Sequence, residues 1–127
     1  YVSPVQYSFR TALAPIELPG GEVLGEGETI VLMLVGGNRD PHVFDEPSHF
    51  DIHRHNARKH LAFGFGIHHC LGAALARMEA EVTWRHLLAR FPDPQAWSLA
   101  GTPMPNPGRM IHGLCSLPVQ VSNRVLA

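Results

Sequence analysis

Apolar and polar positions follow strand-like patterns over the first third of the chain. Residues 6–11 are rich in aromatic and hydroxyl side chains and predict an extended strand. Segments 16–18 and 22–24 flank Pro19-Gly20-Gly21 and predict a tight hairpin, because glycine supplies the positive φ angles of such turns. Residues 29–35 form a continuous β-favouring apolar run, which predicts a buried strand.

No period is visible between residues 40 and 60, where Asp, His, Pro, Asn and Arg predominate. Long irregular stretches in compact domains are usually functional or disordered. Three apolar residues interrupt this one, and we interpret them as anchors of a packed irregular loop: Phe44, Phe50 and Ile52.

A helical period begins near residue 70 and predicts one long helix from about Cys70 to Arg90. Apolar residues recur there every three or four positions and predict a core-facing stripe: Leu71, Ala74, Leu75, Met78, Val82 and Ala89, widened by Trp84 and Leu88. The spacing of Arg77, Glu81 and Arg85 allows ion pairs on the polar side. The run Phe91-Pro92-Asp93-Pro94 ends the helix.

The last part of the chain predicts a loop and a strand. Residues 101–109 are rich in proline and glycine and predict a loop. Residues 114–121 alternate and predict a terminal strand, with Pro118 at an edge or a bulge.

Length and charge narrow the function classes. The chain has 127 residues, enough for one domain of typical size. Its formal net charge is −1 and no Lys/Arg cluster is present, which argues against nucleic acid and anionic membranes as partners. It has neither an apolar run of about 20 residues nor a signal peptide. It begins with Tyr1 rather than Met, so we expect a processed chain or a piece of a longer one.

Cysteine and histidine suggest metal chemistry. Cys70 and Cys115 are too few for a disulfide scaffold, although one disulfide between them stays a minor alternative. Nine histidines are present, concentrated between positions 42 and 69. A zinc site is a weaker alternative, because its candidate ligands lack the usual zinc spacing: His53, His55, His68, His69 and Cys70.

Cys70 has the surroundings of a metal-binding thiolate. A helix N-terminus favours thiolate over thiol, and the N–H groups of Leu71 and Gly72 are expected to donate to the sulfur. Glycines let a flat, bulky ligand approach the backbone: Gly64, Gly66 and Gly72. Phe63 and Phe65 can shield the sulfur from water. A shielded single thiolate suits the fifth ligand of haem iron, whereas the competing interpretation is a buried structural cysteine.

The pattern Phe63-x-x-Gly66-x-His68-x-Cys70-x-Gly72 resembles the haem-binding signature of bacterial cytochromes P-450. The likeness extends along the chain. The segment after the family's K helix resembles residues 1–6, the segment before the ligand loop resembles 38–64, and the closing strand resembles 113–119. The implied fold class is the C-terminal part of the mainly α P-450 fold, with one long helix (about 70–90), short β-hairpins and a long irregular loop. Its implied parts are β-rich 1–35, meander-like 40–60, haem-ligand loop and helix 61–90, and C-terminal loop and strand 98–121.

The resemblance also implies roles for particular residues. Cys70 is the proximal iron ligand. Seven further positions match the family's haem-binding set: Phe63, Gly64, Gly66, His68, Gly72, His60 and Arg10. Three of them, Arg10, His60 and His68, match positions that reach the haem propionates. Arg54 joins a buried ion network with a Glu-x-x-Arg motif that is absent from this chain. The remaining residues match stretches that line the family's substrate pocket: Val5, Gln6, Tyr7, Met110 and Ile111.

The implied function is a cytoplasmic haem-thiolate monooxygenase that hydroxylates C–H bonds of a small organic substrate. It uses haem b, dioxygen and two electrons from a ferredoxin-type donor and its reductase, with the donor docking around His68 and His69. The oxygen-activating helix of the family is absent, so we expect the chain alone to be inactive. Two alternatives remain: a truncated, non-catalytic fragment without haem, and a zinc-binding protein.

Overall fold

The computed structural model describes residues 2–122, so Tyr1 of the predicted segment after the K helix lies outside it. The described chain divides into two compact units. The first comprises the described residues up to Gly64 together with 108–112, and the second comprises 65–107 together with the described residues from Gly113. Each unit is described by itself.

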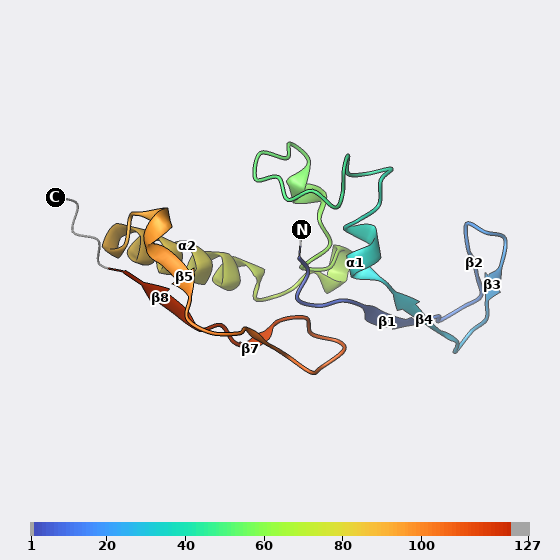
Figure 1. Cartoon of the computed structure of the whole chain (residues 1–127). Helices are drawn as coiled ribbons and strands as arrows, with labels where there is room; N and C mark the ends of the chain where they lie inside the picture. Colours follow the sequence, from blue (N-terminus) through green and yellow to red (C-terminus); the bar gives the residue numbers. More distant parts are fainter. Residues whose placement is uncertain (1, 123–127) are drawn as a thin grey trace. The chain divides into compact units, whose positions relative to one another are not determined.

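The first unit contains two antiparallel ribbons of two strands each (Figure 1). Strand β1 (Ser8–Thr11) pairs with β4 (Thr29–Leu32), and β2 (Ile16–Glu17) pairs with β3 (Val23–Leu24). The predicted hairpin is therefore confirmed, but of its two turn glycines only Gly21 has a positive φ, at 87°. Gly27, at φ 81°, makes the next turn.

The predicted buried strand over 29–35 is wrong in two respects. β4 ends at Leu32, and the helical turn α1 (Leu34–Gly37) follows it directly. Val31 and Leu32 are exposed, because a ribbon of only two strands has no layer to cover either face. Apolar composition predicted the extended conformation but not its cover.

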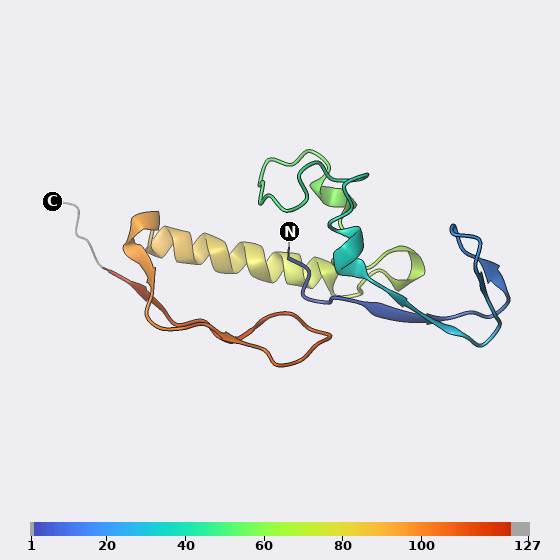
Figure 2. The same ribbon diagram turned by 45° about the vertical axis from the view of Figure 1, so that its right-hand side comes forward.

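The irregular stretch 40–60 contains one short 3₁₀ helix, η1 (Ala57–Lys59), and otherwise turns (Figure 2). Of its three predicted anchors only Phe44 is buried, at 5% exposure, whereas Phe50 and Ile52 are exposed. Polar contacts to the backbone organise this loop more than apolar packing does.

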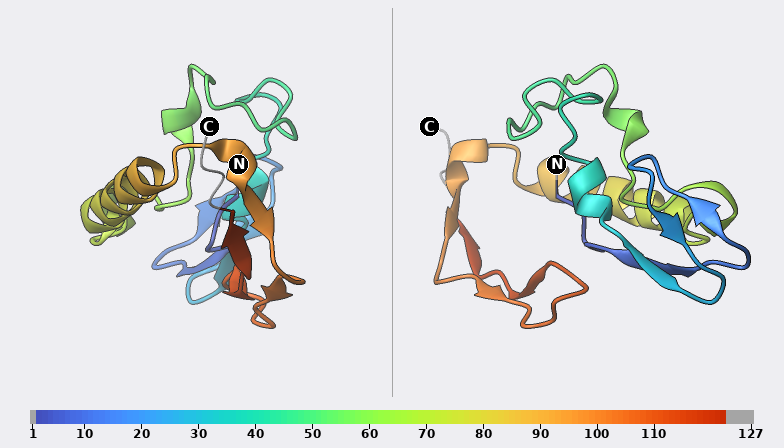
Figure 3. Two further views of the ribbon diagram at one scale, coloured as in Figure 1. Left: turned by 60° about the vertical axis from the view of Figure 1, so that its left-hand side comes forward. Right: turned by 90° about the vertical axis from the view of Figure 1, so that its right-hand side faces the viewer.

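The second unit contains the long helix and two further ribbons. Helix α2 (Ala73–Arg90) follows the 3₁₀ helix η2 (Gly66–His68), and η3 (Pro94–Ala96) leads into β5 (Trp97–Leu99). β5 pairs with β8 (Val119–Val121), and β6 (Met104–Pro105) pairs with β7 (Leu114–Ser116) (Figure 3).

The predicted single strand over 114–121 is two strands in different ribbons. They separate at Leu117-Pro118, because proline has no N–H to donate to a ladder. The sequence pattern did not predict β5, and it predicted a loop where β6 lies.

Helix α2 has one ion pair along its polar side and further contacts just beyond its C-terminal end. Arg85 donates to Glu81 at 2.5 Å along the helix, as the four-residue spacing predicted. Beyond the helix, the Trp97 indole N–H donates to the Phe91 carbonyl at 3.2 Å, and the two rings meet edge to face at 5.8 Å.

None of the described helices combines the length and apolar character needed to cross a membrane.

The apolar stripe of α2 is not a core in this structure, which corrects the prediction. Leu75, Met78 and Val82 are about half exposed, and Ala73 is the one buried residue of the helix. The ribbons of the second unit are too narrow to cover a helix of 18 residues. The helical period identifies the face that requires cover without showing what covers it.

Candidate functional site

The sequence predicted Cys70 in the first turn of the helix. In the structure it lies in a turn between η2 and α2. Gly72 is the N-cap of α2, and the Ala73 N–H donates to the Cys70 carbonyl at 3.2 Å. Glycine is a poor helix former, and helical hydrogen bonding begins with the Ala76 N–H to Gly72 at 2.9 Å. The sulfur thus precedes the N-terminal, positive end of the α2 dipole.

The Cys70 thiol is free and exposed. In the described part of the chain, no backbone N–H donates to its sulfur, so the bonds expected from Leu71 and Gly72 are not formed. Sγ lies 3.9 Å from the place that a Cβ on Gly72 would occupy. The sulfur therefore lies over a backbone that carries no side chain.

Large apolar side chains flank Cys70 and point into solvent. Phe65 is 81% exposed, Ile67 97% and Leu71 101%. The sequence predicted that Phe65 shields the sulfur from water, but this side chain lies in solvent. Exposed apolar side chains beside a free thiol and a glycine turn fit a large, flat, mostly apolar group carrying a thiolate-binding metal. The chemistry of these residues fits a haem that is held through a single thiolate.

The loop before Phe65 is closed by a turn in the first unit. The Gly64 N–H donates to the Leu61 carbonyl at 2.9 Å, and Gly64 has φ 74°, a conformation that favours glycine. The half-buried rings of His60 and Phe63 are 6.0 Å apart and tilted by 55°. His60 Nδ1 accepts from the Ala62 N–H at 3.1 Å.

Asn38 is a residue that the sequence did not single out. Its side-chain oxygen accepts from the Leu61 N–H at 2.6 Å, across 23 positions of sequence. The available signal was an asparagine directly after a glycine pair at the end of an apolar strand. That position suits a side chain that bonds a passing backbone.

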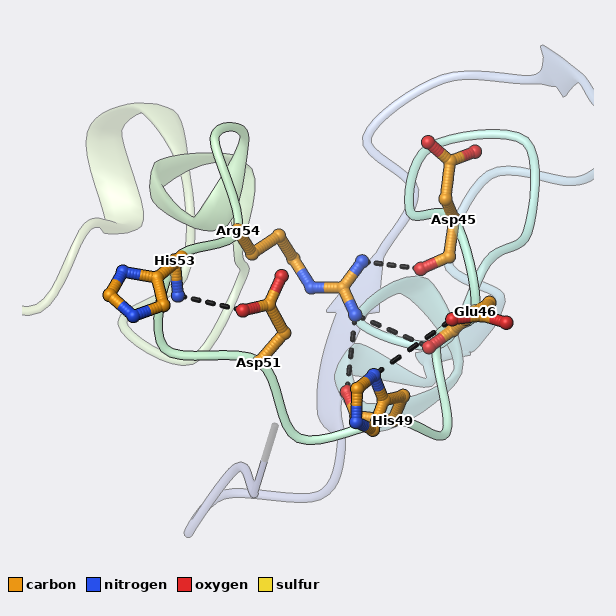
Figure 4. A network of polar contacts seen from close by, with 6 residues as sticks. All are labelled: Asp45, Glu46, His49, Asp51, His53 and Arg54. Carbon is orange, nitrogen blue, oxygen red and sulfur yellow. Dashed lines mark hydrogen bonds and ion pairs between the residues drawn. The ribbon is translucent and has the colours of Figure 1, made fainter.

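Arg54 organises the irregular loop of the first unit (Figure 4). Its guanidinium donates to three backbone carbonyls, those of Asp45, Glu46 and His49; the last two bonds measure 3.2 and 3.1 Å. It also lies 6.0 Å from the centre of the Phe44 ring. These partners are neutral carbonyls and an aromatic face, so the predicted ion network of Arg54 stays a prediction.

The predicted substrate-pocket segments come together within the first unit. Val5 pairs with Ile111, and the Gln6 N–H donates to the Met110 carbonyl at 3.0 Å. Tyr7, the fifth predicted residue, is half-buried. Three side chains of this pairing are exposed: Val5, Met110 and Ile111.

The remaining predicted residues have local partners or solvent around them. Arg10 donates to the Ser8 hydroxyl at 2.8 Å and to the Phe9 carbonyl at 2.6 Å. His68 ends η2 and is exposed. The two cysteines are both free, so the minor disulfide alternative is wrong for this structure. No three His, Cys, Asp or Glu side chains of residues 2–122 gather as metal ligands, so the zinc alternative gains no support.

Comparison with known proteins gives one consistent result. The family model described as cytochrome P-450 matches residues 1–102. Cytochrome P-450 140 of Mycobacterium tuberculosis is 47% identical over 117 residues, which cover 92% of this chain and 26% of that protein. The cytochrome P-450 monooxygenase PikC of Streptomyces venezuelae is 41% identical over 121 residues, 94% of this chain and 29% of that protein.

A solved structure agrees with these relatives. The substrate-free crystal structure of CYP109E1 from Bacillus megaterium matches with a TM-score of 0.85 and 36% identity, covering 96% of this chain and 31% of that one. The chain spans about a quarter of the length of the curated relatives that it matches, 26% in the first case.

Proposed function

The chain belongs to the cytochrome P-450 family, and on that premise we propose that it carries the cysteine side of the haem site of a monooxygenase. Haem is the cofactor that the family implies. The observation that supports the proposal best is the free, exposed Cys70 thiol in a glycine turn flanked by exposed apolar side chains. Within this proposal residues 1–127 are part of one catalytic domain.

Cys70 holds the metal in this proposal, and the residues that match the family's haem-binding positions hold the cofactor. The thiolate is the one protein ligand, and Gly66 and Gly72 leave the backbone open to a flat ring. Arg10, His60 and His68 donate to the propionates, because cationic and imidazole N–H groups pair well with carboxylates. Phe63 and Gly64 complete the set.

Bound haem b supplies the redox chemistry by which dioxygen hydroxylates a C–H bond, and the thiolate increases its electron density. The protein residues bind and orient. We propose that Val5, Gln6 and Tyr7, together with Met110 and Ile111, line the pocket for a small organic substrate. A ferredoxin-type donor, which receives its electrons from a reductase, docks on the surface around His68 and His69. We also propose that the protein is cytoplasmic.

A second candidate is a folded fragment that binds no haem. A specific observation favours it: the buried apolar residues of the described chain are few and mostly small, namely Ala12, Phe44, Ala73 and Ala96. So little burial leaves large apolar faces in water, which is typical of an incomplete or assembling domain.

Haem titration of the 127-residue chain distinguishes the two candidates. We expect a saturable absorbance change of one haem per chain in the wild type and in Cys115→Ser, the matched cysteine control. Cys70→Ser should lose the thiolate spectrum. Non-saturating, equal uptake by all three proteins would contradict the proposal and support the inert fragment.

A further inference from the structure

We infer that Asn38 is a positioning residue that fixes the start of the haem-ligand loop, residues 60–64. The inference rests on the proposed function only for its consequence at the haem. The positioning itself is a property of the first unit. One hydrogen bond and one close approach join the end of α1 to this loop, and hydrogen bonds within α1 and within the loop support them.

The backbone of Asn38 is itself fixed. It is the C-cap residue of α1, and its N–H donates to the Leu34 carbonyl at 3.0 Å. The next residue, Arg39, donates from its N–H to Gly36 at 2.9 Å. A side chain on such a fixed backbone loses little further freedom when it forms a bond.

From this position the Asn38 side chain holds Leu61. Its Oδ1 accepts from the Leu61 N–H at 2.6 Å, and both residues are half-buried. The preceding residue is also adapted to Leu61, since a Cβ on Gly37 would lie 2.9 Å from Leu61 Cδ1. The Leu61 backbone is bonded to Asn38 while its side chain occupies the space over Gly37.

Leu61 in turn determines the geometry on both sides of it. Its carbonyl accepts from the Gly64 N–H and closes the turn that carries Phe63. The next amide, that of Ala62, donates to His60 Nδ1, so the proton of the neutral His60 ring is on Nε2. Asn38 thereby fixes which ring nitrogen His60 presents as a donor, the nitrogen that would meet a propionate.

The test separates the acceptor of Asn38 from its size and its polarity. Asn38→Leu keeps the branched shape of the side chain but removes the acceptor, and Asn38→Asp keeps an acceptor for the Leu61 N–H. Asn56→Leu is the matched control, because Asn56 is another half-buried asparagine of this unit and donates to the Val43 carbonyl at 2.5 Å. Residue-resolved amide hydrogen exchange of the 127-residue chain is the first measurement.

We expect Asn38→Leu to accelerate exchange of the Leu61 and Ala62 amides about tenfold, the factor for roughly one hydrogen bond. Asn38→Asp should remain within about threefold of wild type, and Asn56→Leu should leave both amides unchanged. Unchanged Leu61 exchange in Asn38→Leu would overturn the inference. So would equal acceleration in Asn38→Leu and Asn56→Leu, which would indicate general destabilisation.

Haem affinity and the ¹⁵N shifts of the His60 ring are the second measurement. We expect Asn38→Leu to weaken haem binding several-fold and to mix the two His60 tautomers, with Asn38→Asp restoring both. If the wild type binds no haem, the proposed function fails, and the Leu61 exchange and His60 tautomer still decide the positioning.

Discussion

Replacing Arg54 by lysine tests whether the irregular loop depends on a guanidinium fork or on a positive charge. The guanidinium donates to three backbone carbonyls, of Asp45, Glu46 and His49. Lysine keeps the charge but cannot present donors in a planar fork. If each hydrogen bond contributes about 0.5–1.5 kcal/mol net, the three together contribute roughly 2–4 kcal/mol. With one bond retained by lysine, we expect a loss of roughly 2 kcal/mol.

Hydrogen exchange within the loop measures this loss locally. The amides of Phe44 and His49 are bonded to Asp40 and Glu46 at 2.9 and 2.8 Å, so they report on opening of the loop. A loss of about 2 kcal/mol corresponds to roughly thirtyfold faster exchange. Arg58→Lys, an exposed arginine of η1, is the matched control and should leave both amides unchanged.

The salt dependence of amide exchange in Arg54→Lys distinguishes hydrogen bonds to carbonyls from an ion pair. The bonds observed go to neutral carbonyls, so raising the salt concentration should leave the effect of Arg54→Lys nearly constant. An ion-pair role would instead weaken with screening. Wild-type exchange rates in Arg54→Lys, or an effect that disappears in high salt, would show that the carbonyl bonds do not hold the loop.

Three smaller changes test local geometry, each by urea denaturation. Gly66→Ala should cost about 1–2 kcal/mol, because Gly66 has φ 62°; an equal cost for Gly113→Ala, which has open space and no positive φ, would contradict this. Trp97→Phe should cost about 1 kcal/mol by removing the indole donor to Phe91, and an unchanged stability would show that the bond is dispensable. Glu81→Gln should cost under about 0.5 kcal/mol, because its ion pair is exposed; a loss above 1 kcal/mol would contradict this.

Local chemistry was readable from the sequence wherever one residue type dictates the conformation. The Gly-Gly hairpin at 19–21 and the helix stop at Pro92 follow from backbone rules that require no partner. The family signature around Cys70 was equally readable, because it is a local pattern of residue types within ten positions of the sequence.

Burial was not readable, because it depends on what lies opposite. The apolar runs at Thr29–Leu32 and along α2 predicted core positions, yet both are largely exposed in units whose ribbons have two strands. Asn38 was missed for a related reason: its partner, Leu61, is 23 residues away. Side-chain bonds between distant segments leave no period in the sequence.

The central claim is that Cys70 supplies a thiolate to a haem iron, and the spectrum of the reduced, CO-bound protein tests it most directly. Haem-loaded wild type and Cys115→Ser should both show the strongly red-shifted Soret band of thiolate ligation. Cys70→His should bind haem without that band. A red-shifted band that persists in Cys70→His would contradict the assignment of the ligand.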